Sequence, residues 1–331
     1  MNKSTYDLVS TRKVFSTIGL ALCAILVITT ILQALWLSVP VLIWGEDNWM
    51  TTSSWGKWIV SFVPLYLVAI PVGLLIMRKL PAQAPQDNRL EAKDFFVILP
   101  ICFCLMYGGN LVGTWLSMLL SGGNAQNALT DYVMDTNPIK ILVMVILAPL
   151  LEEFVCRKQI IDRTRQYGEK IAVILSALTF GLLHQNLFQF FYAFGLGLVF
   201  AYIYTRTGRL RYPVILHSII NLLGSVVAPW IVAHVDMDVL TSIDPNMAPE
   251  ALIALYREIL PGLLGLLAYA LLLVGLAISG LVLLILKYKE LVWKESDMQL
   301  AKGTVAKTVY LNAGMAAYIL ICVASCIYAL F

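Results

Sequence analysis

The sequence predicts an all-α protein, a polytopic bundle of about eight to nine transmembrane helices. Of its 331 residues, 60% are hydrophobic and only 13% are charged, whereas soluble domains average about 25% charged residues. Backbone polar groups in lipid must be paired internally, which leaves helices or a closed barrel. The apolar runs are long and do not alternate with polar residues, so they favour helices.

Nine apolar segments are candidate spans, separated by polar loops. The first begins an apolar run over 14–44 that is too long for the hydrophobic region of a signal peptide. It also lacks a small-residue cleavage site, so we expect a retained helix. The candidate spans are 14–40, 58–77, 95–120, 139–161, 170–187, 188–204, 213–233, 262–286 and 309–331.

Small residues and helix-ending residues mark several of these spans. The third contains Gly108, Gly109 and Gly113, which would allow a neighbouring helix to approach closely. Gly208 follows the sixth span as a helix stop, and Pro213 helps to begin the seventh. The segment 234–257 is the longest predicted outer loop.

Positive charges orient the bundle, because Lys and Arg gather in cytoplasmic loops. They cluster before the first span and after the second, fourth, sixth and eighth, while the intervening loops are acidic. We therefore expect a multi-pass protein of a prokaryotic plasma membrane, with the N-terminus in the cytoplasm and the C-terminus outside. The acidic residues of the predicted outer loops are Glu46, Asp47, Asp131, Asp135, Asp236 and Asp238.

The most informative polar residues are two adjacent glutamates within the fourth span. Glu152 and Glu153 would be expensive in hydrocarbon, where an ionised side chain at a helix centre costs roughly 2.5–3.5 kcal/mol. Glu153 and Arg157 are spaced i,i+4 and can pair on one helix face. Glu152 points about 100° away and has no cation at i+3 or i+4 on its own helix. This asymmetry predicts one structural carboxylate and one that is free to act.

The histidines add to this prediction, since the chain has only three. His184 lies near the end of the fifth span, and His217 shares a face of the seventh span with Asn221, four residues on. Two histidines, an asparagine and a free glutamate on three helices indicate a site. His234 stands alone at a loop boundary, and we interpret it as a surface residue.

These residues form an ordered set of motifs. Glu-Glu-x-x-x-Arg at 152–157 is followed by Phe-x-x-x-His at 180–184, by a glycine-containing helix ending in Thr-Arg-Thr-Gly at 205–208, and by His-x-x-x-Asn at 217–221. The set resembles the CPBP family, which includes CAAX prenyl proteases of the Ras-converting type, bacteriocin-processing and self-immunity proteins, and the Abi group. The resemblance implies a core at 139–230 within a single membrane domain, 1–331, flanked by helices in 1–138 and 231–331.

The resemblance further implies an intramembrane, glutamate-dependent endopeptidase. Glu152 with His184 would activate a water, and His217 with Asn221 would form the oxyanion hole. Glu153 and Arg157 would support the site. The substrate would be a membrane-associated peptide or protein, such as a peptide precursor, a signal-peptide remnant or a bacteriocin-like leader.

Two rival chemistries use overlapping residues. Glu152, Glu153, His184 and His217 could instead hold a zinc ion, although the chain has no His-Glu-x-x-His. Cys156, one turn after Glu152, could be a nucleophile beside His184, although all six cysteines lie in apolar segments, as packing residues do. The favoured reading requires no metal and no cofactor.

Two other classes of protein stay open. Intramembrane Glu, His and Arg also form proton relays in transporters, but the inverted repeats and broken helices typical of transporters are not visible. A non-catalytic immunity or scaffold protein is disfavoured because every motif position holds the expected residue. The expected partners are the peptide or protein substrate and the lipid bilayer, and no nucleic acid.

Straight helices would place the site residues at unequal depths. At 1.5 Å per residue from the cytoplasmic end, Glu152 would lie about 13 Å deep, His217 about 6 Å and His184 about 20 Å. We therefore expect tilted or offset helices that bring the three side chains together.

Overall fold

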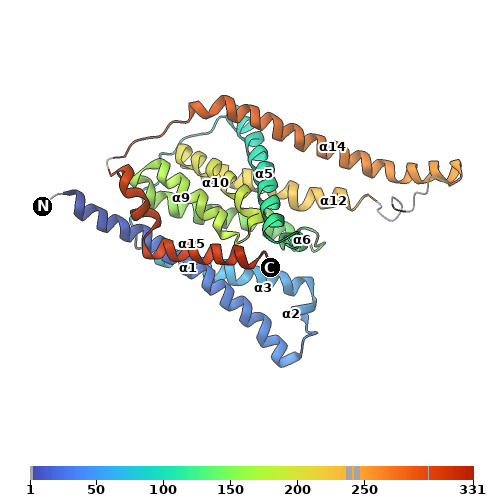
Figure 1. Cartoon of the computed structure of the whole chain (residues 1–331), viewed down its shortest axis with the longest axis horizontal. Helices are drawn as coiled ribbons and strands as arrows, with labels where there is room; N and C mark the ends of the chain where they lie inside the picture. Colours follow the sequence, from blue (N-terminus) through green and yellow to red (C-terminus); the bar gives the residue numbers. More distant parts are fainter. Residues whose placement is uncertain (1–2, 236–240, 242–246, 297) are drawn as a thin grey trace.

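The computed structural model describes residues 3–235, 241, 247–296 and 298–331, and over these residues it contains helices and no strand. The predicted all-α bundle is confirmed (Figure 1). The predicted outer-loop residues Asp236, Asp238 and Pro245 lie outside the described residues.

The helical elements follow one another along the chain, and the label η marks both π-helical stretches (η1, η2, η3, η5 and η8) and short 3-10 turns (η4, η6 and η7). In chain order the elements are α1 (Lys3–Trp44), α2 (Trp49–Thr52), α3 (Ser54–Val63), η1 (Pro64–Ala69), α4 (Ile70–Met77), α5 (Ala92–Leu120), α6 (Leu129–Val133), η2 (Ile141–Leu147), α7 (Ala148–Glu153), η3 (Phe154–Gln159), α8 (Ile160–Thr164), the 3-10 turn η4 (Arg165–Tyr167), α9 (Glu169–Leu183), α10 (Leu187–Thr207), α11 (Arg211–Leu222), η5 (Leu223–Val227), α12 (Ala228–Val232), α14 (Pro249–Lys287), η6 (Tyr288–Glu290), η7 (Lys302–Thr304), η8 (Ala306–Tyr310) and α15 (Ala313–Tyr328).

Among the described residues, six helical segments are long and apolar enough to cross a membrane, or seven if one bent pair counts as a span. The pair Lys302–Tyr310 and Ala313–Tyr328 bends by 68°. The predicted spans at 139–161 and 170–187 are helical but are not among the six. α9 has only 15 residues, fewer than the roughly 20 that cross the hydrocarbon core, and the helix through 152–163 carries six charges. The six are Leu8–Trp44, Ser54–Met77, Ala92–Leu120, Leu187–Thr207, Arg211–Val232 and Pro249–Glu290.

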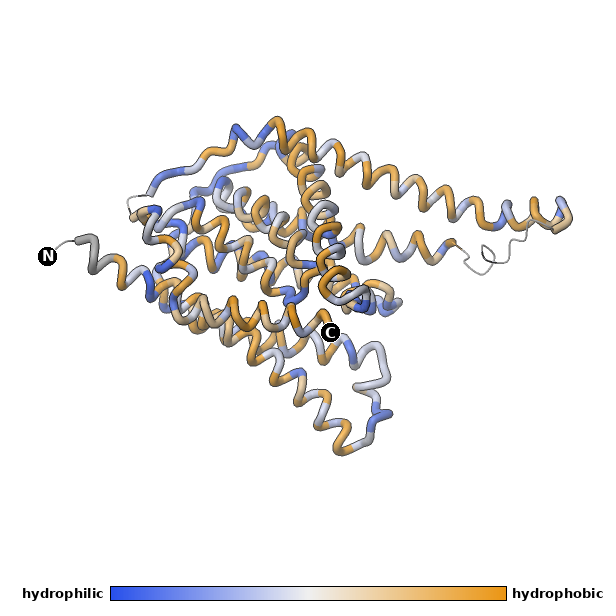
Figure 2. Tube along the Cα trace, viewed as in Figure 1, coloured by the Kyte–Doolittle hydropathy of each residue, from blue (hydrophilic) through white to orange (hydrophobic). Residues whose placement is uncertain are grey.

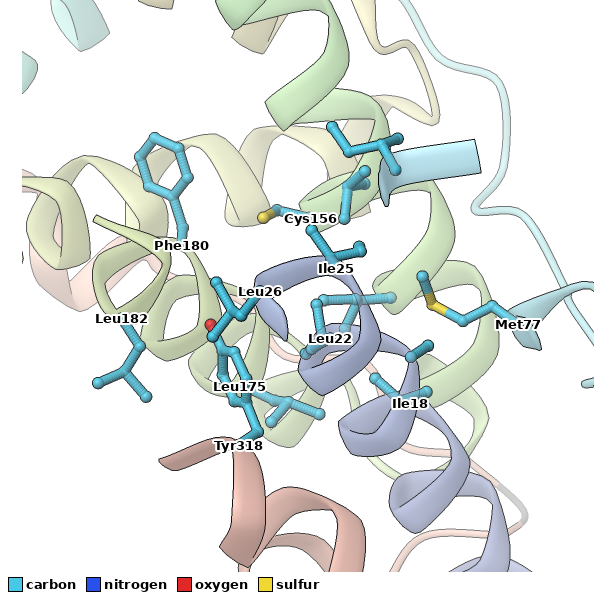
Figure 3. Close-up of a cluster of buried hydrophobic side chains, with 14 of the residues drawn as sticks. Ile18, Leu22, Ile25, Leu26, Met77, Cys156, Leu175, Phe180, Leu182 and Tyr318 are labelled. Carbon is cyan, nitrogen blue, oxygen red and sulfur yellow. The ribbon is translucent and has the colours of Figure 1, made fainter. Parts of the chain in front are cut away.

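The main hydrophobic cluster lies where α1, α9 and α15 meet the helix that carries the glutamates. Figure 3 shows Leu22 and Ile25 of α1 facing Cys156 and Leu175, with Tyr318 of α15 beside them, and all five are at most 2% exposed. Close packing of this kind holds helices together in lipid, where the hydrophobic effect between helices is absent.

Glycines let two helices approach closely, as the sequence of the third predicted span indicates. A Cβ on Gly109 would lie 2.5 Å from the backbone of Tyr192, and one on Gly113 would lie 2.3 Å from the carbonyl oxygen of Leu187. Both contacts pack α5 closely against α10, the helix that begins just after the turn at His184. Gly108 faces open space, so the packing role that we expected holds for two of the three glycines.

The cation-rich loops meet at one end of the bundle. The backbone N–H of Gln83 donates to the Asp162 carbonyl at 2.6 Å, and that of Asn88 donates to the Thr207 carbonyl at 2.8 Å. The N–H of Lys294 donates to the Glu169 carboxylate at 2.7 Å. Figure 2 shows hydrophilic segments gathered at this end, towards the N-terminus. The alternate loops that share positive charge therefore lie on the same side.

Candidate active site

Glu153 and Arg157 form the buried ion pair that their spacing predicts. The Arg157 Nε donates to Glu153 Oε2 at 2.7 Å, and Nη2 donates to Oε1 at 3.2 Å. Both side chains are fully buried. A two-pronged guanidinium–carboxylate contact is directional, so Glu153 is held ionised in a fixed orientation.

The same arginine ties this helix to α9. Its Nη1 donates to the Ser176 hydroxyl at 2.8 Å, and that hydroxyl donates to the Cys156 carbonyl at 2.7 Å. The guanidinium carbon also lies 4.6 Å from the centre of the Phe180 ring, a cation–π contact that stabilises a desolvated charge. Arg157 therefore fixes the distance between the glutamate helix and the helix that leads to His184.

His217 is held by Glu153. Its Nδ1 lies 3.1 Å from Glu153 Oε1. A carboxylate held by arginine can only accept, so Nδ1 carries a proton and donates it. The Nε2 atom then faces Glu152, 4.0 Å from its Oε2. One buried carboxylate thus fixes the ring orientation of the histidine that lies next to the other carboxylate.

The two adjacent glutamates differ in accessibility. The Glu152 side chain is 26% exposed and that of Glu153 is fully buried. Within the described residues the Glu152 carboxylate forms no hydrogen bond, and its nearest charged contact is His217. The structure therefore separates the pair as helical geometry predicts: one is buried and paired, the other partly open.

His184 is held at the turn between α9 and α10. Its Nδ1 donates to the Phe180 carbonyl at 2.9 Å, which leaves Nε2 as the basic nitrogen of a neutral ring. The next residue, Gln185, has a φ of +54°, which tightens the turn. Asn186 then caps α10 by accepting from the Gln189 N–H and donates to the His184 carbonyl at 2.8 Å.

The Phe180 ring lies between the two histidines. Its centroid is 5.2 Å from that of His184 and 5.5 Å from that of His217, edge-on to both. Glu152 Oε2 lies 4.0 Å from Nε2 of His217. Glu152, His217 and His184 are therefore linked through Phe180 into one cluster, although a count along straight helices places them at different depths.

Asn221 occupies the turn after His217 but is not a free donor. One of its amide N–H groups donates to the Met144 carbonyl at 2.8 Å, across to η2. Together with the bond from His217 to Glu153, this leaves one donor on Asn221 and the Nε2 side of His217 available. His234 is exposed, lies 2.7 Å from the Trp230 carbonyl, and is the surface residue that we predicted.

The cluster also includes side chains that the sequence analysis did not single out. Ser176 lies four residues before Phe180, which lies four residues before His184, so the i,i+4 spacing on this helix face was an available signal for Ser176. Tyr66 and Tyr192 also interact electrostatically with Glu152, and no spacing relative to the motifs could have identified Tyr66.

The ligand geometry and the cysteine bear on the rival chemistries. Within the described ranges, no group of three or more His, Cys, Asp or Glu side chains is placed to hold a metal ion. Cys156 is fully buried within the cluster of Figure 3. Its setting is that of a packing residue.

Comparisons with known proteins match the segment that holds this cluster. A model of the family described as type II CAAX prenyl endopeptidase Rce1-like matches residues 135–223. The membrane-embedded CAAX protease MroQ of Staphylococcus aureus (strain USA300) is 31% identical over 177 residues, which span 49% of this chain and 71% of that protein. The chain belongs to the CPBP family.

Another CPBP-like relative is YdiL of Bacillus subtilis (strain 168), whose assigned name suggests a membrane peptidase. It is 25% identical over 176 residues, which span 50% of this chain and 69% of that protein. No solved structure matches the chain. Membership in the CPBP family makes this chain a membrane protease of the CAAX type, and the Glu152–His217 cluster lies within the segment that the family model matches.

Proposed function

We propose that this protein is an intramembrane endopeptidase in which Glu152 and His184 activate a water that hydrolyses a peptide bond. The observation that carries the proposal is the division of the glutamate pair: Glu153 is neutralised by Arg157, whereas Glu152 is partly open and has no hydrogen-bond partner among the described residues. A general base must be able to reach a water and to accept its proton. Glu152 meets both requirements.

In the proposed reaction, Glu152 takes a proton from the water as its oxygen attacks the carbonyl carbon. His184 orients the same water through Nε2, the nitrogen left free by the bond from Nδ1 to Phe180. Glu152 then passes the proton to the departing amide nitrogen as the carbon–nitrogen bond breaks. The products are a carboxylic acid and an amine. A positioned general base contributes about 10²–10⁴-fold to the rate.

His217 and Asn221 are the proposed oxyanion donors. Nδ1 of His217 already donates to Glu153 at 3.1 Å, so donation from Nε2 to the oxyanion requires a proton on each ring nitrogen. Asn221 donates through the amide hydrogen that Met144 does not use. Removing one such donor typically costs about 10²–10³ in kcat.

The proposal also covers the extent of the catalytic core, its orientation in the membrane and the class of substrate. We assign the catalytic core to residues 139–230, within one membrane domain, and place the N-terminus and the cation-rich end of the bundle in the cytoplasm. The name of MroQ describes a membrane-embedded CAAX protease, and we assign to this chain a membrane-associated peptide or protein substrate, cut near the cytoplasmic surface of the plasma membrane.

The test does not require a known substrate. Purified protein in lipid nanodiscs would be incubated with a library of lipid-anchored peptides, and new termini would be detected by mass spectrometry. Wild type is expected to produce a consistent set of cleavages, which Glu152→Gln abolishes and Cys156→Ala leaves intact. Cleavage that persists in Glu152→Gln would refute Glu152 as the base, and cleavage lost in Cys156→Ala would favour the cysteine chemistry.

A further inference from the structure

Tyr66 of η1 has a buried hydroxyl without a partner. The residue is 6% exposed, and its Oη forms no hydrogen bond within the described part of the chain. An unpaired buried hydroxyl is destabilising, so such groups in folded proteins require an explanation. The residue lies in the second span, outside the segment 135–223 that the family model matches.

The helix that carries Tyr66 packs against the helix that carries the glutamates. α4, which continues η1, contacts η3, which follows directly after Glu153, and Tyr66 shares a buried cluster with Cys156, one turn after Glu152. The charge of Glu152 also acts on the Tyr66 hydroxyl. Glu152 itself accepts no hydrogen bond from a described residue. A buried donor without an acceptor therefore lies near an open acceptor without a donor.

The other neighbours of Glu152 already have different attachments. The Tyr192 hydroxyl accepts from the Gln189 amide at 2.8 Å, and Cys156 is fully buried in the hydrophobic cluster. His184 and His217 are oriented by Phe180 and Glu153 through their Nδ1 atoms. Tyr66 alone among these groups brings a side-chain hydroxyl with no bond of its own in the described residues.

The ring of Tyr66 is fixed even though its hydroxyl is unpaired. It belongs to the same buried cluster as Phe180 and Cys156, and its centroid is 5.6 Å from that of Phe62. It also lies in a π-helical segment that begins at Pro64, a backbone form that is frequent at functional sites. A rigid ring with a free hydroxyl is suited to holding a small polar molecule in one place.

We propose that the Tyr66 hydroxyl binds the water that Glu152 activates, and so acts as a water-positioning residue supplied by a helix outside the matched segment. The inference rests on the proposed function. The water donates one hydrogen to Glu152 and the other to Nε2 of His184, and it accepts from Tyr66. Its remaining lone pair is then directed at the substrate carbonyl. Tyr66 keeps its proton throughout.

The test is Tyr66→Phe, with Tyr318→Phe as a matched control. Each change removes one oxygen from a buried tyrosine, but the Tyr318 hydroxyl donates to the Thr179 carbonyl at 3.0 Å, whereas that of Tyr66 is unpaired. Tyr66→Phe is expected to keep or raise the thermal midpoint and to lower kcat about 10–100-fold, the effect of misplacing a reactant. KM should stay within about twofold, because the substrate itself keeps its contacts.

The pH dependence of kcat distinguishes a water-positioning role of the Tyr66 hydroxyl from a role in packing alone. Losing a hydrogen bond relayed to the Glu152 carboxylate disfavours its ionised form, so the acid limb of kcat should move to higher pH in Tyr66→Phe. Tyr318→Phe should lower the thermal midpoint and leave that limb in place. Unchanged kcat and pH profile in Tyr66→Phe, or a loss of activity that only follows a fall in thermal midpoint, would overturn the proposal.

Glu152→Gln, measured in parallel, distinguishes a failure of the proposed role of Tyr66 from a failure of the proposed function. If Glu152→Gln is inactive and Tyr66→Phe behaves as wild type, the role of Tyr66 fails and the proposed function stands. If Glu152→Gln retains wild-type cleavage, the proposed function fails and the role of Tyr66 fails with it.

Discussion

Glu153 holds His217 in place: Nδ1 of the histidine lies 3.1 Å from Oε1 of a fully buried carboxylate that Arg157 already binds with two hydrogen bonds. The Arg157–Glu153–His217 chain joins the glutamate helix to α11. It aims the other imidazole nitrogen at Glu152, 4.0 Å away. The buried glutamate thus organises the cluster, and the partly exposed one keeps its carboxylate without a hydrogen bond from the described residues.

Glu153→Gln should destabilise the protein far more than Glu152→Gln. The first change leaves the fully buried Arg157 without its counter-charge, and breaking such a pair costs about 3–5 kcal/mol. The second removes a charge from a side chain that is 26% exposed and has no hydrogen bond to lose. Unfolding in mixed detergent and SDS micelles would measure both free energies. Equal losses would contradict the division of the pair.

Asn186→Ala should lower both stability and activity. The substitution removes the cap of α10, worth about 1 kcal/mol, and the bond from Asn186 Nδ2 to the His184 carbonyl. His184 should then be less well placed and kcat should fall. The control is Gln185→Gly at the adjacent residue, whose φ of +54° suits glycine. It should keep stability and activity, and a loss as large as that of Asn186→Ala would indicate that any change in this turn is harmful.

Asp135, in the loop before η2, should make the stability of the folded protein fall at acid pH. Burial alone would raise its pKa, but hydrogen bonds from the Asn137 N–H, Ser54 and Trp58, with Lys57 nearby, lower the pKa below its ordinary 3.8. Its stabilising contribution is therefore complete above the unfolded pKa and is lost as pH falls through the lower, folded value.

The measurement is the thermal midpoint of wild type and Asp135→Asn between about pH 3 and pH 7, a range that includes the titration of the unfolded carboxyl group. Wild type should be the more stable at neutral pH, and the difference should shrink towards the acid end. A difference that stays constant with pH would show that the carboxylate charge contributes nothing.

Chelation should leave cleavage unchanged if Glu152 activates the water without a metal. The assay would compare wild type before and after treatment with a strong chelator, followed by addition of zinc. Activity that falls with chelator and returns with zinc would instead support Glu152, Glu153 and the histidines as ligands. Direct metal analysis of the purified protein would provide an independent readout.

Local spacing accounts for what could be predicted. The Glu153–Arg157 pair follows from i,i+4 geometry within one helix, and the helix stop at Gly208 follows from its position after the last turn: it adopts a left-handed φ of 64°. The close approach at Gly109 and Gly113 was also anticipated, because a small residue in a span permits it. The ion pair and the helix stop depend on residues near one another in the chain, whereas the glycines show only that a close approach is possible and not which helix makes it.

Contacts between helices could not be predicted in the same way. The bond from Asn221 to Met144 joins residues 77 apart, and that from His217 to Glu153 joins residues 64 apart. Hydropathy alone also does not show where a helix ends: the helix in the apolar stretch at 170–187 stops at a capped turn after 15 residues. No periodicity within one helix specifies the depth or rotation of its neighbour.

The sequence by itself determined an all-α membrane bundle, the polar residue types of the candidate site and the pairing of Glu153 with Arg157. Only the tertiary structure decided that Glu153 also holds His217, that Phe180 lies between the two histidines, and that the buried Tyr66 hydroxyl has no hydrogen-bond partner among the described residues. The reason is physical. Helical periodicity sets directions within a helix, whereas the offsets between helices come from side-chain packing and glycine contacts spread over the whole chain.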